Sequence, residues 1–275
     1  PRTLPAAIAP VLVGTAAAER FIAWRFAAAF IVGLSIQIAV NYANDYFDGI
    51  KGVDTEHRVG PRRAVASGLV SPSRMKGAIA TTLAVAAGAG TALAVATTPW
   101  LLAVGGLAFL AALGYSGGPK PYASVGLGEV FVFVFFGLVA TTGSAFVQDE
   151  RIGRVAVLAA IPMGLLATAI LVANNLRDID TDRAAGKVTL PSRLGHDKAR
   201  SLYRALLLGA FPFVPLIAGA TGSPWSMLPF LSLPLAIPLL NKVRAEGRDL
   251  IAVLIGTARV EMIFGVLLAV GLWIS

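Results

Sequence analysis

Apolar stretches of roughly 17 to 25 residues recur along the whole of this 275-residue sequence, and a helix of that length crosses the hydrocarbon core of a bilayer. The stretches are continuous and rich in Ala, Leu, Val and Gly, without the apolar and polar alternation of a membrane barrel. The sequence therefore predicts an all-α integral membrane protein. Hydropathy places about nine spans, near 4–18, 21–45, 73–96, 99–115, 125–146, 155–175, 199–220, 225–241 and 249–274.

The composition excludes a soluble domain of this length. Hydrophobic residues make up 56% of the chain and charged residues only 14%, and the mean hydropathy is +0.76. A soluble fold of this size could not bury that much apolar surface. The sequence has no cysteine, which excludes disulfides, cysteine metal ligands and thiol catalysis. We expect a single transmembrane domain over residues 1–275.

The net charge of +8 has an explanation in membrane topology. With nine spans, the N-terminus and the loops after the second, fourth, sixth and eighth spans share one side of the membrane. Of the 23 Lys and Arg residues, 18 lie on that side, so the positive-inside rule makes it cytoplasmic. We therefore expect a multi-pass protein of the cell membrane, with the lipid bilayer as a partner and no nucleic acid.

Two segments on the predicted cytoplasmic side, 44–76 and 174–204, are far more polar than topology requires. Around the start of the first segment, two Asn and two Asp residues follow a spacing of i, i+3, i+4 and i+7. A helix that continued beyond the apolar span would present all four side chains on one face. They are Asn41, Asn44, Asp45 and Asp48. Like charges on one face repel, so a cation is expected against them.

A similar stripe opens the second segment, where Asn174, Asp178 and Asp182 stand at i, i+4 and i+8 with Asn175 beside the first of them. Four predicted spans separate the two stripes, and an even number of spans keeps the same orientation. The chain thus reads as two pseudo-repeated halves of a bundle around a central, lipid-accessible cavity. Chance similarity between the two stripes is the alternative.

Cations follow each stripe, notably Arg58 and Arg63 after the first and Lys187 after the second. Hard oxygen ligands without His or Cys favour Mg²⁺, and Arg binds phosphate oxygens in a bidentate manner. This pattern predicts a site for a Mg²⁺–diphosphate complex. No glycine-rich P-loop is present, so an isoprenoid tail within the bundle is expected instead of a nucleotide. Ordinary solvated ion pairs are the alternative, and the Asn residues could equally be helix caps.

The pair of motifs N-D-Y-F-D (44–48) and N-N-L-R-D-I-D-T-D-R-A-A-G-K-V-T-L-P-S-R-L-G (174–195) resembles the two aspartate-rich motifs of the UbiA superfamily of intramembrane aromatic prenyltransferases. The resemblance covers essentially the whole chain. It implies Mg²⁺ as cofactor, polyprenyl diphosphate as donor and an acceptor that is usually aromatic. In the family the first motif is commonly D-x-x-D-x-x-x-D, whereas the next acid after Asp48 in this sequence is Asp54.

Other stretches are similar to one branch of that family, which prenylates 1,4-dihydroxy-2-naphthoate on the way to menaquinone. They are G-I-K-G-V-D (49–54), R-V-G-P (58–61), G-K-V-T-L-P-S-R-L-G (186–195) and Y-S-G-G-P-K-P-Y (115–122). The resemblance implies that the substituted ring carbon also loses its carboxylate as CO₂. Transfer to 4-hydroxybenzoate, haem or chlorophyll precursors is the alternative within the family, and a transporter or a membrane scaffold is the alternative outside it.

On this reading, four carboxylates would hold the metal and act in catalysis by stabilising the departing diphosphate. They are Asp45, Asp48, Asp178 and Asp182. Arg58, Arg63 and Lys187 would bind the diphosphate. The amides of Asn41, Asn44, Asn174 and Asn175 would orient carboxylates, water or phosphate as substrate-binding groups.

Tyr115 and Lys120 lie in the third cytoplasmic loop and are further candidates for substrate binding. Lys120 could bind diphosphate or the carboxylate of the acceptor. A Lys at the end of a span is equally a topology anchor, and Tyr at that depth equally belongs to an aromatic belt. Glycines 88, 90, 105 and 106 are expected to permit close packing of helices.

Overall fold

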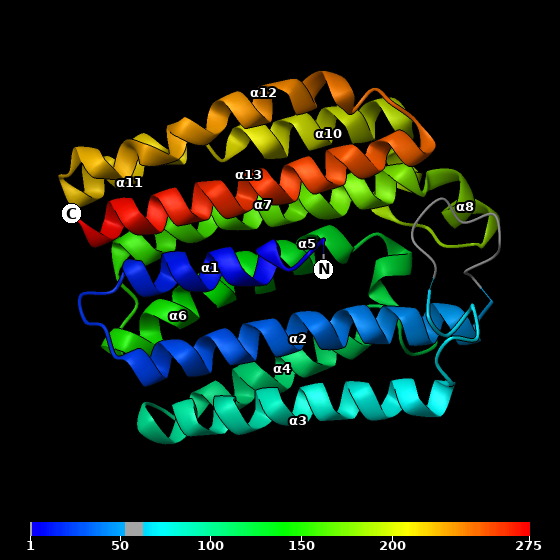
Figure 1. Cartoon of the computed structure of the whole chain (residues 1–275), viewed down its shortest axis with the longest axis horizontal. Coiled ribbons are helices and arrows are strands. Elements are labelled where there is room, and N and C mark those ends of the chain that lie inside the picture. Colours follow the sequence, from blue (N-terminus) through cyan, green and yellow to red (C-terminus); the bar gives the residue numbers. More distant parts are fainter. Residues whose placement is uncertain (1, 53–62) are drawn as a thin grey trace.

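The computed structural model describes residues 2–52 and 63–275 as a bundle of long helices that lie side by side (Figure 1). Within these residues the chain forms helices and turns and no strand. The prediction of an all-α bundle is confirmed. In chain order the elements are α1 (Pro5–Ala16), α2 (Ala23–Ile50), α3 (Pro72–Ala96), α4 (Trp100–Gly114), η1 (Tyr122–Val125), α5 (Gly128–Val132), η2 (Phe133–Val139), α6 (Ala140–Asp149), α7 (Arg154–Arg177), α8 (Ile179–Ala184), α9 (Leu190–Leu194), α10 (His196–Gly209), α11 (Phe213–Thr221), η3 (Pro224–Ser232), α12 (Leu233–Lys242), η4 (Gly247–Asp249) and α13 (Leu250–Trp273).

Six helical stretches of the described chain are long and apolar enough to cross a membrane, and two shorter apolar helices, α1 and α4, accompany them. The six are Ala23–Ile50, Pro72–Ala96, Gly128–Asp149, Arg154–Arg177, His196–Thr221 and Gly247–Trp273. The chain is therefore a multi-pass membrane protein, while the count of nine spans stays a prediction. The range predicted at 225–241 contains the 3₁₀ helix η3 and then α12. Its prolines remove backbone donors, which favours this irregular form over one long α-helix.

The bundle has two groups of helices with a third set between them (Figure 1). α2, α3 and α4 contact one another, while α7, α10, α11, α12, α13 and η3 form the other group. α1 and α6 contact both α2 and α7. The largest cluster of buried apolar residues lies in the second group, around Leu166 on α7 and Phe264 on α13. A cavity lies outside this cluster, on the α2 side of α7.

Close helix contacts occur at glycines other than those we expected. A Cβ on Gly88, Gly105 or Gly106 would meet nothing within 4 Å, and one on Gly90 would touch only Val32 at 3.9 Å. The expectation of close packing there is wrong. The contact glycines are Gly14, Gly137, Gly164, Gly265 and Gly271, where an added Cβ would collide with a neighbouring helix. Glycine content in an apolar span does not reveal which face meets a neighbour.

Gly137 provides a stability prediction. It lies in the π-helical turn η2, and a Cβ there would collide with the backbone of Gly164 on α7. Gly137→Ala is expected to lower the free energy of unfolding by about 1–3 kcal/mol, because neither backbone can yield cheaply. Gly143→Ala is the matched control, since nothing lies within 4 Å of its Cβ position in the same span. The apparent unfolding temperature in detergent should fall for the first variant and not for the second. Equal values would show that the two helices separate easily.

Candidate active site

The first polar stripe lies on the last turns of α2. This helix continues to Ile50, so the first seven residues of the segment expected as a loop from 44 are helical. Continuation of the helix places Asn41, Asn44 and Asp45 on the wall of a cavity, as the i, i+3, i+4 spacing indicated. Asp48, one turn further, is buried and does not line that cavity.

Asp45 anchors the chain that returns to α2 after the cytoplasmic loop. Its two carboxylate oxygens accept hydrogen bonds from the backbone N–H groups of Ala64 and Val65, both at 2.9 Å. Arg63 also lies here, and its Nη2 donates to the Oδ1 of Asn44 at 2.5 Å. Arg63 therefore contacts the first stripe, and its expected role in binding diphosphate stays a prediction. Arg58 lies outside the described residues, so its role stays a prediction.

The second stripe does not form one continuous helix face, contrary to the i, i+4, i+8 expectation. α7 ends at Arg177, and Asp178 has φ −100° and ψ 9° before the short helix α8 begins. A hydrogen bond from Asp182 N to Asp178 O at 2.8 Å preserves one turn across this junction. The predicted loop 174–204 is likewise mainly helical, because it contains α8, α9 and the start of α10.

Arg177 organises the second stripe. Its Nε donates to Asp178 Oδ1 at 2.7 Å and its Nη2 to Asp178 Oδ2 at 2.5 Å. The same Nη2 donates to Asn174 Oδ1 at 3.1 Å. The Arg177 side chain is only 2% exposed, and both Arg177 and Asn174 line the cavity. This bidentate pair fixes the orientation of the Asp178 carboxylate.

Lys187 joins the two stripes. Its Nζ lies 3.4 Å from Asp48 Oδ2 on α2, and its backbone N–H donates to Asp182 O at 2.8 Å. Thr189 Oγ1 lies 3.4 Å from Asp182 Oδ2. Two segments 139 residues apart in sequence therefore meet at one end of the bundle. The structure thus brings the two acidic stripes together at the end where the even number of spans between them placed both.

Three other predicted residues have different surroundings. Asn175 donates from Nδ2 to Glu129 Oε1 at 3.0 Å on α5, is buried, and does not itself line the cavity. Lys120 is exposed and does not line the cavity either. Tyr115 does line it, and the carbonyl oxygen of its neighbour Ser116 accepts a hydrogen bond from Lys51 Nζ, at the end of α2, at 3.0 Å. Of these three, only Tyr115 is placed to touch a ligand at the acidic end.

Tyr122, the last residue of the Y-S-G-G-P-K-P-Y stretch, also belongs to the cavity wall. Its ring stacks on Phe131 with 4.0 Å between centroids, and its hydroxyl donates to Ala111 O at 2.8 Å. Burial raises the pKa of Tyr122 above its usual value, so the hydroxyl remains a donor. The hydrogen bond and the stacking hold η1, α4 and α5 together at the polar end of the cavity.

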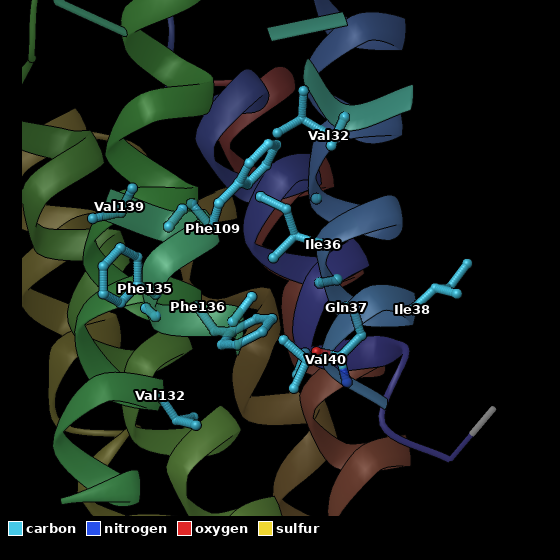
Figure 2. A pocket seen from close by; sticks show the side chains of 18 of the residues that line it. Val32, Ile36, Gln37, Ile38, Val40, Phe109, Val132, Phe135, Phe136 and Val139 are labelled. Carbon is cyan, nitrogen blue, oxygen red and sulfur yellow. The ribbon is translucent and has the colours of Figure 1, made fainter. Parts of the chain in front are cut away.

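The cavity has a volume of about 1070 Å³ and extends from the acidic end into the bundle between α2, α4, α7 and the α5–α6 span. Figure 2 shows Ile36, Phe109 and Phe136, from α2, α4 and η2, among the side chains that surround it. In the part of the chain that the structure describes, the charged residues that line this cavity are Asp45, Arg2, Arg63 and Arg177. Three of these four, Asp45, Arg63 and Arg177, belong to the acidic end. A long apolar pocket with most of its charges at one end suits a ligand that has an apolar tail and an anionic head.

The donor set at the acidic end fits Mg²⁺ bound jointly with phosphate oxygens. Among residues 2–52 and 63–275, no three Asp, Glu or His side chains are grouped as a metal site. Mg²⁺ usually takes one or two carboxylates from the protein and the rest of its ligands from water and substrate phosphates. Two pairs of Asp residues, one turn apart on α2 and across the α7–α8 junction, match that requirement.

Together the bundle, the apolar cavity and its acidic end define the class: an intramembrane prenyltransferase. A family model described as the UbiA prenyltransferase family matches residues 7–249. The chain belongs to this family.

Its curated relatives include a protein of Mycobacterium tuberculosis (strain ATCC 25618 / H37Rv) named 1,4-dihydroxy-2-naphthoate octaprenyltransferase. It is 44% identical over 98% of this chain and 93% of the relative. A protein of Escherichia coli (strain K12) with the same name is 38% identical over 90% and 83% of the two chains.

Solved structures share the fold. The apo structure of a UbiA homolog from Aeropyrum pernix K1 superposes with a TM-score of 0.76 at 19% identity, over 97% of this chain and 96% of the other. A UbiA homolog from Archaeoglobus fulgidus, solved bound to DMAPP and Mg²⁺, superposes with a TM-score of 0.66 at 13% identity, over 98% and 96%. The UbiA fold therefore extends over nearly the whole chain.

Proposed function

We propose that this protein transfers a polyprenyl group from polyprenyl diphosphate to 1,4-dihydroxy-2-naphthoate, with release of diphosphate and CO₂, and so forms demethylmenaquinol for menaquinone. The main observation in support of prenyl transfer is that two acidic stripes meet at the end of a long apolar cavity. The choice of 1,4-dihydroxy-2-naphthoate as acceptor is supported by relatives at 38–44% identity that are named as octaprenyltransferases of this compound. Residues 1–275 would act as a single domain, with the active site facing the cytoplasm because the cations gather there.

The diphosphate would lie between the two stripes. Asp45, Asp48, Asp178 and Asp182 would hold Mg²⁺, which when bound neutralises charge on the departing diphosphate. Arg63 and Lys187 lie beside these carboxylates and would donate hydrogen bonds to phosphate oxygens. Cations that contact the leaving group stabilise the charge that develops as the allylic carbon–oxygen bond breaks.

The prenyl chain would occupy the apolar cavity. Phe135 and Phe136 line it, and aromatic faces stabilise the positive charge of an allylic carbon while the apolar wall excludes water. An electron-rich carbon of the naphthoate ring would attack that allylic carbon and form the new carbon–carbon bond. Departure of the carboxylate as CO₂ leaves its bonding electron pair in the ring, which restores aromaticity.

A direct assay tests the acceptor. Purified protein in lipid with labelled polyprenyl diphosphate and Mg²⁺ is expected to form prenylated product with 1,4-dihydroxy-2-naphthoate and at least 10-fold less with 4-hydroxybenzoate. The two acceptors differ in ring size and in the position of the carboxylate, which a fitted pocket distinguishes. Chelation of Mg²⁺ should abolish product. Product with 4-hydroxybenzoate alone would replace the proposed acceptor, and equal rates with and without chelator would remove the metal from the mechanism.

A further inference from the structure

The segment before α1 adds polar groups to the cavity wall deeper than the acidic stripes. Thr3 Oγ1 accepts hydrogen bonds from Gln37 Nε2 at 2.7 Å and from Asn41 Nδ2 at 3.3 Å. Gln37 precedes Asp45 by eight residues on α2, which is about 12 Å along the helix axis. Figure 1 shows α1 beginning beside the middle of α2. The cavity therefore has a second polar position, well inside the bundle.

Arg2 brings a positive charge next to Thr3 in the sequence. It is exposed, and it lines the cavity together with Thr3 and Gln37. A cation on the wall of an otherwise apolar cavity favours a ligand of opposite charge. Among the described residues, no carboxylate forms an ion pair with Arg2. The adjacent N-terminal end of α1 adds further positive potential, so this position favours an anion.

Thr3 supplies a hydrogen-bond donor at the same place. Its hydroxyl oxygen already accepts two hydrogen bonds, from Gln37 and Asn41. A hydroxyl has two acceptor positions and one proton, so the remaining capacity of Thr3 is as a donor. A guanidinium and a hydroxyl donor on one wall of a cavity form a carboxylate site, since Arg binds carboxylates through two parallel N–H groups.

We propose that Arg2 and Thr3 bind the carboxylate of the aromatic acceptor, with Gln37 and Asn41 holding Thr3 in place. This inference rests on the proposed function and adds the residues that select an acceptor with a carboxylate. Thr3 lies between one and two helical turns deeper than Asp45, because its partners Asn41 and Gln37 are four and eight residues earlier on α2. The acceptor ring would therefore span the gap between Arg2 and the diphosphate, where the allylic carbon is released.

Kinetics on single variants test this assignment. Arg2→Gln is expected to raise the KM for 1,4-dihydroxy-2-naphthoate about 10-fold to 100-fold, the loss typical of a charge-assisted hydrogen bond. The KM for polyprenyl diphosphate should stay within about twofold. Thr3→Val should raise the acceptor KM by about fivefold through loss of a neutral donor. Arg74→Gln is the matched control, because Arg74 is exposed on α3 and does not line the cavity.

Competition separates carboxylate binding from general packing. With the wild-type protein, 1-hydroxy-2-naphthoate should inhibit more strongly than 1-naphthol, which lacks the carboxylate, and Arg2→Gln should abolish that preference. An unchanged acceptor KM in Arg2→Gln and Thr3→Val, or a rise in the diphosphate KM alone, would overturn the inference while the proposed reaction stands. Absence of product from folded wild-type protein with the naphthoate would overturn the proposed function and this inference with it.

Discussion

Asp182→Asn is expected to lower kcat/KM for prenyl transfer at least 100-fold. Asp182 is buried at the end where the two acidic stripes meet, and Lys187 and Thr189 contact it. Asn keeps the size of the side chain and removes the charge that would hold Mg²⁺. Loss of one group that stabilises developing charge typically costs about 10² to 10³ in rate. The Mg²⁺ concentration for half-maximal rate should rise as well.

Asp180→Asn is the matched control for this variant. Asp180 lies on the same short helix α8, two residues earlier, and its side chain is 84% exposed. Its only ion-pair partner in the described chain is His196, at 3.7 Å. Rates for Asp180→Asn should remain within about twofold of wild type, as is usual for exposed charges. Equal losses in the two variants would mean that overall charge near the membrane surface, and not metal binding, supports the reaction.

Arg177→Met is expected to lower the free energy of unfolding by about 3–5 kcal/mol, because it leaves the buried Asp178 carboxylate without its bidentate partner. The Arg177 and Asp178 side chains are 2% and 11% exposed. Met preserves much of the apolar stem, so the effect reports the lost charge. Unfolding in detergent, followed by heat or denaturant, measures it. The substitution should also reduce transfer, since the Asp178 carboxylate loses its fixed orientation.

Two comparisons make the Arg177 result specific. The double variant Arg177→Met, Asp178→Asn should recover part of the lost stability, because no charge remains buried alone, but it should not recover activity. Arg151→Met is the exposed control, since Arg151 pairs with Glu19 where both side chains are largely exposed, and such pairs contribute little. A stability loss in the double variant equal to that of Arg177→Met would show that Arg177 acts through packing alone.

Features that depend on neighbouring residues along the chain were predictable from the sequence. The apolar stretches gave the helices because a backbone in lipid must satisfy its own hydrogen bonds. The i, i+3, i+4 spacing placed Asn41, Asn44 and Asp45 on one face of α2, and the structure has them on the cavity wall. An even number of spans between the stripes correctly indicated that both lie at one end of the bundle.

Features that depend on contacts between distant segments were not predictable in this way. The turn at Asp178 breaks the second stripe, Asn175 contacts Glu129, and Lys120 is exposed and does not line the cavity. The Asn175 contact depends on which surfaces of separate helices meet, and the other two depend on where a helix ends; helical spacing carries no information on either. The same reason explains why the contact glycines were misplaced.

The sequence by itself determined that this protein is a helical membrane bundle with two acidic stripes, because hydropathy and helical periodicity are local properties. Only the tertiary structure decided what surrounds those stripes. It placed Lys187 against Asp48 and closed Arg177 onto Asp178. It also brought Thr3 beside Gln37, 34 residues away, on the wall of the cavity. Such placements follow from the packing of whole helices, in which a side chain's partner is fixed by shape and distance rather than by position along the chain.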